Sequence, residues 1–95
     1  MEVRHLVKPP HSKSLKSARV TLAPGEEVGE HVTEEREEVI TVLKGKAVLA
    51  MDGKAVALSE GESHFIPEGT RHNVRNESKG TLDYVYVVSV FPPRR

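Results

Sequence analysis

Cysteine and tryptophan are both absent from this sequence. Without cysteine the chain can form no disulfide, offers no thiolate nucleophile and cannot build a cysteine-type zinc site. Any metal ion must therefore be held by histidine nitrogens and by carboxylate or hydroxyl oxygens. The lack of cysteine also fits the reducing interior of a cell, so we expect a cytoplasmic protein.

An excess of charge of either sign is missing as well. The 14 lysine and arginine residues balance the 14 aspartate and glutamate residues, so the formal net charge is zero. Domains that bind nucleic acid normally show a basic excess, and modules that bind anionic membranes carry polybasic clusters. The balance argues against both kinds of partner. Because the sequence also has no run of about 18 apolar residues and no charged-then-apolar leader, we expect neither a transmembrane helix nor a secretory signal.

The 95 residues suffice for one small domain and leave no room for a second. We divide the chain into an N-terminal arm, residues 1–15, and a single barrel domain, residues 16–95. Pro9-Pro10 in the arm blocks helix formation and favours an extended conformation.

Short segments with strand character fill the barrel domain. Residues 16–22 alternate between polar and apolar side chains, which predicts a strand. Further strands are predicted over 39–43, 47–51, 55–58, 63–66, 71–75 and 84–91. The segment 33–38 contains helix-forming residues but has no apolar face, so we interpret it as a loop or a strand edge. About eight short strands with closely spaced turns predict an all-β sandwich or barrel.

A turn between two of these strands and the last strand itself say more about the fold. Asp52-Gly53 lies between two apolar runs, which is a strong signal for a β-hairpin. The last predicted strand, YVYVVSVF, is apolar on both faces, as expected for a central or covered strand. Its residues Tyr84 and Tyr86 share one face and line either a cavity, the core or a dimer contact.

Glycine, histidine and glutamate occur at regular spacings in two further segments. Gly25 is followed by five residues and then His31; Glu38 comes seven positions later and Gly45 seven positions after that. The second segment, GESHFIPEGTRHNVRN, begins at Gly61 and includes a Pro-X-Gly turn, His72 and Asn76.

These two segments resemble the motifs of the cupin superfamily. The first cupin motif has Gly, five residues, His-X-His, three or four residues, Glu, six residues and Gly. The segment GEEVGEHVTEEREEVITVLKG fits every spacing, with Thr33 in the place of the second His. The second motif, with Gly, five residues, Pro-X-Gly, two residues, His, three residues and Asn, is matched completely. The resemblance extends from residue 17 to about residue 91 and implies an all-β fold, the cupin double-stranded β-helix or jelly-roll-like barrel.

The residue types at these positions suit a metal ion. Two-residue periodicity places Glu38 on the same strand face as Ile40, and His31 and His72 lie beside turns from which a barrel can direct side chains inward. Two imidazoles and one carboxylate suit Fe(II), Mn, Ni or Zn and leave positions open for water or substrate. The resemblance implies His31, Glu38 and His72 as the metal ligands.

Several alternatives remain open around these ligands. A neutral threonine hydroxyl is a poorer ligand than imidazole, so Glu34 could replace Thr33 if the strand bulges, or the three remaining ligands could act alone. The barrel could also have lost its metal. His64 lies in phase with Ile66 and could serve as an acid or base in the cavity, although a histidine in a strand is more often structural.

We therefore expect a protein that binds a divalent transition-metal ion (Mn, Fe, Ni or Zn) and, through it, a small organic molecule. If it is an enzyme, the chemistry implied is that of a metal-dependent oxygenase, isomerase or decarboxylase. A non-catalytic ligand-binding or sensing module and a metal-free structural barrel are the alternatives, because a fold does not dictate a function.

The last strand also bears on assembly. One of its apolar faces packs into the barrel and the other needs a cover, which the N-terminal arm could supply in part and a second copy of the chain more fully. We predict a homodimer that buries at least about 1,200 Å² in total.

Overall fold

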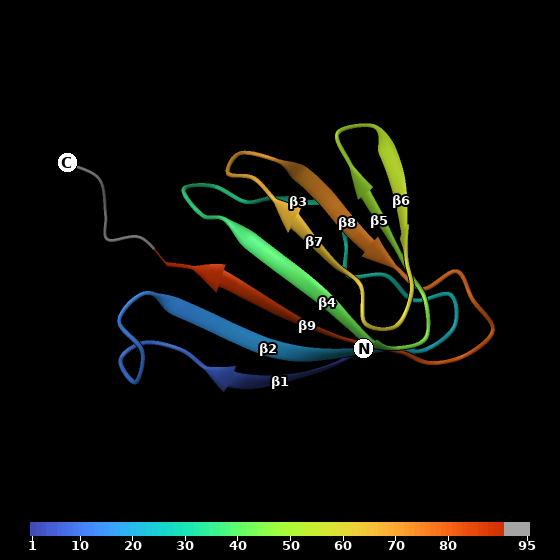
Figure 1. Cartoon of the computed structure of the whole chain (residues 1–95), viewed down its shortest axis with the longest axis horizontal. Helices are drawn as coiled ribbons and strands as arrows, with labels where there is room; N and C mark the ends of the chain where they lie inside the picture. Colours follow the sequence, from blue (N-terminus) through green and yellow to red (C-terminus); the bar gives the residue numbers. More distant parts are fainter. Residues whose placement is uncertain (91–95) are drawn as a thin grey trace.

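The computed structural model describes residues 1–90, which form strands and loops without any helix. The nine strands are β1 (Glu2–Val7), β2 (Leu15–Leu22), β3 (His31–Val32), β4 (Glu38–Lys44), β5 (Ala47–Met51), β6 (Lys54–Leu58), β7 (Ser63–Ile66), β8 (Arg71–Arg75) and β9 (Leu82–Ser89). They form a five-stranded sheet, β1-β2-β9-β4-β7, and a four-stranded sheet, β3-β8-β5-β6 (Figure 1). The prediction of an all-β fold is confirmed. Within the described part of the chain, nothing resembles a helix that could cross a membrane.

The apolar strand at the end of the chain lies in the centre of the larger sheet, between β2 and β4. Its inward-facing residues Tyr84 and Val88 are buried, whereas Val87 points outward and is exposed. Both faces are apolar because one covers the core and the other forms part of an apolar outer surface. Phe91, the last residue of the predicted strand, lies outside the described residues.

Side chains from both sheets fill the space between them. Five large side chains have no exposed surface: Leu22, Ile40, Ile66 and Leu82 from the larger sheet and Leu49 from the smaller one. Burying side chains of this size contributes about 1.5–3 kcal/mol each, so this layer is a main source of stability.

The inner face of the larger sheet changes character from one end to the other. Cross-strand neighbours are Leu22 and Leu82 at one end, and Lys16, Val88 and Glu38 at the other. Leu22 and Leu82 are fully buried in the core, whereas Lys16, Val88 and Glu38 line a cavity.

The segment predicted as an N-terminal arm includes an edge strand. β1 pairs antiparallel with β2, from Glu2 opposite Thr21 to Val7 opposite Ser17, with an irregularity between His5 and Val7. The sequence shows little sign of this strand because its residues are exposed or half-buried and therefore have no core-facing alternation. The pairing attaches the segment to the barrel.

Two turns follow directly from local chemistry. Asp52 and Gly53 join β5 to β6 with φ values of 50° and 76°, the positive values that a tight hairpin turn requires, so the predicted hairpin is confirmed. Gly45, which ends the first motif, has a φ of 86°, and a Cβ atom there would collide with the carbonyl oxygen of Thr81. This position therefore needs glycine for two separate reasons.

Candidate metal centre

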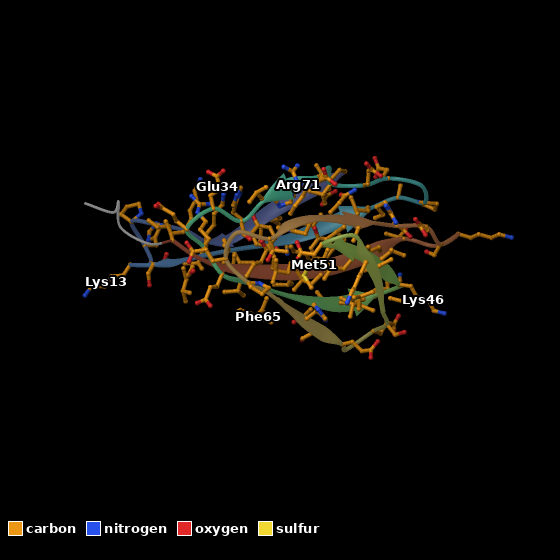
Figure 2. The ribbon with its side chains drawn as sticks, turned by 90° about the horizontal axis from the view of Figure 1, so that it is seen from above. Lys13, Glu34, Lys46, Met51, Phe65 and Arg71 are labelled. Carbon is orange, nitrogen blue, oxygen red and sulfur yellow. The ribbon has the colours of Figure 1, made fainter. Side chains whose placement is uncertain are left out.

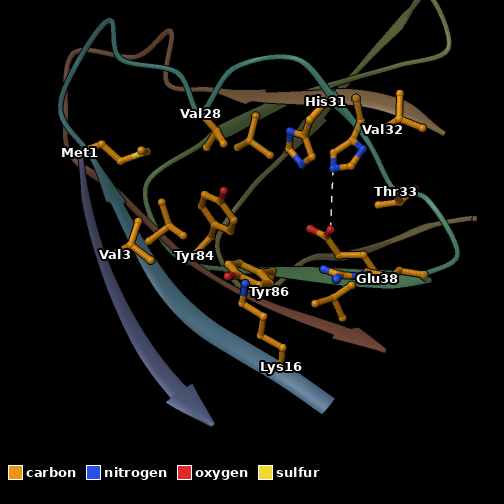
Figure 3. A pocket seen from close by; sticks show the side chains of 15 residues that line it. Met1, Val3, Lys16, Val28, His31, Val32, Thr33, Glu38, Tyr84 and Tyr86 are labelled. Atoms are coloured by element: carbon orange, nitrogen blue, oxygen red, sulfur yellow. Dashed lines mark ion pairs between the residues drawn. The ribbon is translucent and has the colours of Figure 1, made fainter. Parts of the chain in front are cut away.

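Three side chains from both sheets meet at the open end of the barrel. His31 on β3 and His72 on β8 are direct cross-strand partners, and their ring centroids lie 4.1 Å apart. Glu38, the first residue of β4, faces them from the larger sheet (Figure 3). One potential ligand atom from each residue lies within 4.8 Å of the others. The structure thus brings together the three residues that the sequence motifs single out.

Backbone carbonyl groups orient both imidazole rings. Nδ1 of His31 lies 2.9 Å from the carbonyl oxygen of Gly29, and Nδ1 of His72 lies 3.1 Å from that of Thr70. A carbonyl oxygen can only accept, so each Nδ1 carries the proton and donates it. In a neutral ring with this tautomer, Nε2 carries the lone pair, which is the arrangement found in histidines that ligate metals.

Nε2 of His72 is a buried atom without a hydrogen-bond partner among residues 1–90. It lies 3.7 Å from Oε1 of Glu38, too far for a hydrogen bond (Figure 3, dashed line). A buried polar atom without a partner is unfavourable. Metal–ligand distances of about 2.0–2.2 Å allow one ion to contact both atoms, so the residues present fit a metal.

Burial shifts both of these groups toward their neutral forms. Desolvation raises the pKa of Glu38, and the nearby His31 opposes this shift. Desolvation lowers the pKa of His72, although its hydrogen bond to Thr70 acts in the other direction. A neutral imidazole is the form that binds a metal, and a divalent cation would stabilise the Glu38 carboxylate that burial disfavours.

Thr33 connects β3 to the turn of the second motif. Its buried hydroxyl donates a hydrogen bond to the carbonyl oxygen of Pro67 at 2.9 Å and accepts one from the backbone N–H of Thr70 at 3.3 Å. Thr33 is therefore a structural residue in this fold, and its side chain also lies in the wall of the cavity.

Two further candidates lie away from the three ligands. Glu34 is exposed and borders a separate surface hollow with Glu68, so it does not replace Thr33 at the site. His64 is half-buried on β7, opposite Ile40, and does not line the cavity. The structure thus gives no support to an acid or base role for His64.

Asn73 is a buried residue near the site that the sequence does not single out. Its Oδ1 accepts a hydrogen bond of 2.8 Å from the backbone N–H of Gly29, whose carbonyl in turn receives the Nδ1 proton of His31. Asn73 thereby helps to fix the loop that orients His31. Because Asn73 lies next to His72 on β8, one strand supports both histidines.

A cavity of about 290 Å³ opens beside the three candidate ligands. Its walls are mainly apolar, and Tyr84 and Tyr86 contribute aromatic surface (Figure 3). Burial and the nearby Glu38 raise the pKa of both tyrosine hydroxyls, so both stay protonated at neutral pH. Lys16 and Arg36 line the same cavity, and the sequence motifs identify neither of them.

Several solved structures share this fold. A predicted oxalate decarboxylase (tm1287) from Thermotoga maritima is 30% identical, with a TM-score of 0.86 over 94% of this chain and 79% of that one. TT1209 from Thermus thermophilus is 27% identical, with a TM-score of 0.87 over 97% and 85% of the two chains. A cupin 2 conserved barrel domain protein from Salinispora arenicola is 26% identical, with a TM-score of 0.79 over 94% and 74%. No curated protein matches the sequence.

The family model described as "Cupin domain" matches residues 18–89, which include both motifs and all three candidate ligands. The match agrees with the two-sheet barrel and with the residues that meet at its open end. The chain belongs to the cupin family.

Proposed function

We propose that this cupin binds one divalent transition-metal ion through His31, Glu38 and His72 and holds a small organic molecule beside it. The observation that carries this proposal is the buried Nε2 of His72, which has no partner among residues 1–90 and lies 3.7 Å from Oε1 of Glu38. An ion is the partner that satisfies both atoms at once. The adjoining cavity of about 290 Å³ provides space for the organic molecule.

The donor set restricts the choice of metal. Two imidazole nitrogens and one carboxylate oxygen suit Mn, Fe(II), Ni or Zn and leave coordination positions free. When bound, such an ion supplies a Lewis acid that polarises a ligand oxygen or lowers the pKa of a bound water. The residues of this chain hold the ion, fix the imidazole tautomers through Gly29 and Thr70, and surround the ligand with apolar walls.

Catalytic turnover is a second candidate function. The similar Thermotoga maritima protein is described as a predicted oxalate decarboxylase, so decarboxylation is the first reaction to test on this chain. Loss of carbon dioxide from oxalate by the metal-loaded protein, measured as formate production, would support an enzyme. Metal and ligand binding without formate would favour a binding or sensing module.

The metal proposal is tested by elemental analysis of protein purified without a chelator or a metal-affinity step. We expect about one transition-metal ion per wild-type chain and almost none in His72→Gln. His64→Gln is the matched control, because it removes a histidine that lies outside the site, and it should keep its metal. Circular dichroism verifies that both variants are folded. An unchanged metal content in folded His72→Gln would refute the assignment.

We also propose that two copies of the chain pair through the outer face of the five-stranded sheet. Phe65, Val39 and Val87 are cross-strand neighbours on β7, β4 and β9, and their exposed fractions are 50%, 41% and 39%. Phe65 points away from the molecule on the side opposite Arg71 (Figure 2). β1 extends the edge of this sheet and does not lie across its face, so a second copy is the better cover.

A further inference from the structure

Lys16 lies in the same cross-strand row as the candidate metal ligand Glu38. It pairs with Val88 on β9, and Val88 pairs with Glu38 on β4, so all three side chains belong to the inner face of the larger sheet. With strands about 4.7–4.9 Å apart, the Cα atoms of Lys16 and Glu38 are separated by roughly 10 Å. The Lys16 side chain extends from β2 toward the ring of Tyr86 (Figure 3). Lys16 and Glu38 thus line the same cavity from two strands of the larger sheet.

Arg36 brings a second cation to the same cavity from the loop between β3 and β4. It is close enough to Tyr86 for its charge to counteract the effect of burial on the pKa of that residue. Among residues 1–90, neither Arg36 nor Lys16 forms an ion pair. Two cations that form no ion pair within the described residues therefore line one small cavity.

The charge of the cavity selects the kind of molecule that can fill it. Among residues 1–90, Glu38 is the one acidic side chain that lines it, against the two cations, so this lining is positive even before a divalent ion adds its charge. A neutral ligand would displace water from the two cations and leave them without partners, which is unfavourable. An anionic oxygen group would instead form charge-assisted hydrogen bonds with both.

We propose that the cavity binds a small organic anion whose far end is a carboxylate or phosphate group held by Lys16 and Arg36. The near end of the anion has an oxygen that faces the metal ligands, and Tyr84 and Tyr86 contact its carbon atoms. This inference rests on the proposed function and assigns a ligand class to it. The cavity volume of about 290 Å³, at the lower end of the usual range for ligand sites, restricts the ligand to a small molecule.

The chain contains a natural reporter for such a ligand. Tyr84 and Tyr86 are its two tyrosines, both line the cavity, and no tryptophan is present to mask their emission. Tyrosine fluorescence therefore reports directly on occupancy of the cavity. Isothermal titration calorimetry gives an independent value of the affinity.

The experiment compares succinate and glycerol 3-phosphate with succinamide, a neutral analogue that closely matches the shape of succinate. Each is titrated into zinc-loaded and metal-free wild-type protein, into Lys16→Met and into Arg36→Gln. Lys46→Met is the matched control, because this exposed lysine lies outside the cavity. Zinc affinity is measured for every protein before the ligands are added.

We expect at least one of the two anions to bind zinc-loaded wild-type protein at least tenfold more tightly than succinamide does. Loss of one charge-assisted contact should weaken anion binding about tenfold or more in Lys16→Met and in Arg36→Gln, and Lys46→Met should behave as wild type. The preferred anion distinguishes a carboxylate from a phosphate ligand. Because each cation has its own variant, the test does not depend on the folding of either one.

Two results would overturn the proposal. The first is that succinamide binds as tightly as the better anion, or that neither anion binds. The second is that neither Lys16→Met nor Arg36→Gln changes the affinity for the anion. If zinc binds normally in these cases, the metal site stands and the ligand class is wrong. If zinc does not bind, the proposed function fails, and the cation variants are compared in the metal-free protein, where the same contacts are expected.

Discussion

His31 and His72 orient their imidazole rings in the same way. Nδ1 of each ring donates to the backbone carbonyl two residues earlier, Gly29 at 2.9 Å and Thr70 at 3.1 Å. The two residues are also direct partners in the β3–β8 pair. The same kind of hydrogen bond to the backbone therefore orients two neighbouring rings. The site is therefore organised by the backbone, and changes that move the backbone near Gly29 or Thr70 should affect it most.

A first prediction concerns Asn73, whose amide oxygen binds the N–H of Gly29. Asn73→Ala should lower metal affinity about tenfold, because residues that orient metal ligands typically contribute 10–100-fold. Calorimetry with zinc provides the measurement. Asn76→Ala is the control: Asn76 bonds the carbonyls of Leu22 and Gly80, so its loss should reduce stability without changing zinc affinity. Wild-type affinity in Asn73→Ala would contradict the positioning role.

A second prediction concerns Thr33. Thr33→His adds an imidazole at the spacing of the first cupin motif, so metal affinity should increase. The substitution also removes the hydroxyl that bonds Pro67, which should lower the free energy of unfolding by about 1 kcal/mol.

Thr33→Val separates these two effects. It removes the hydroxyl at nearly constant shape, so it should reduce stability without any gain in affinity. Zinc titrations and urea unfolding of the three proteins provide the comparison. If folded Thr33→His binds zinc no better than wild type, the fourth position is not available to a ligand in this barrel.

A third prediction concerns pH and Asp83 on β9. Hydrogen bonds from the Thr21 hydroxyl at 2.6 Å and from Arg19 at 2.9 Å lower the pKa of Asp83. Its pKa is thus lower in the folded than in the unfolded chain, where it is about 3.9. The stabilisation is complete above the unfolded value and disappears as the pH falls through the folded value.

The free energy of unfolding, measured in urea from pH 6 down to pH 2, should therefore fall less steeply for Asp83→Asn than for wild type. Asp52→Asn, at the exposed β5–β6 turn, is the control and should follow the wild-type curve. Equal slopes for wild type and Asp83→Asn would show that the network around Asp83 does not contribute to acid sensitivity.

A fourth prediction concerns assembly. Light scattering at tens of micromolar should give twice the chain mass of 10.5 kDa. Phe65→Lys places a charge in the exposed row with Val39 and Val87 and should yield a folded monomer. Leu6→Lys, which changes an exposed apolar residue of β1, should remain a dimer. A wild-type mass of 10.5 kDa would rule out the homodimer.

Much of the fold could be predicted from the sequence because its signals are local. The Asp52-Gly53 turn depends on two residues, and the strands around it show their pattern over a few positions. β1 gives no such signal, since an edge strand with exposed residues has no core-facing alternation. β3 has two residues, too few for any periodicity.

The candidate site was predictable for the residues that motif spacing identifies, and not for those that depend on long-range pairing. The sequence alone identifies the three candidate ligands, because they lie at fixed spacings along the sequence from glycines: His31, Glu38 and His72. Lys16 approaches the site because β2 pairs with β9 in one register, and a shift by one residue would turn its side chain to the other face. The structural role of Thr33 likewise depends on Pro67, 34 positions away.

The three candidate ligands come from different sheets, two from β3 and β8 and one from β4. They meet at the end of the barrel where charged residues replace the apolar layer. An ion there would act as a cross-link between the sheets, in a chain that has no cysteine to form a covalent one. Its stabilising effect would be adjustable, amounting to about 2.7 kcal/mol at a free concentration of 100 times Kd and vanishing when the ion is removed. The resistance of this barrel to unfolding would then follow the metal supply of its surroundings.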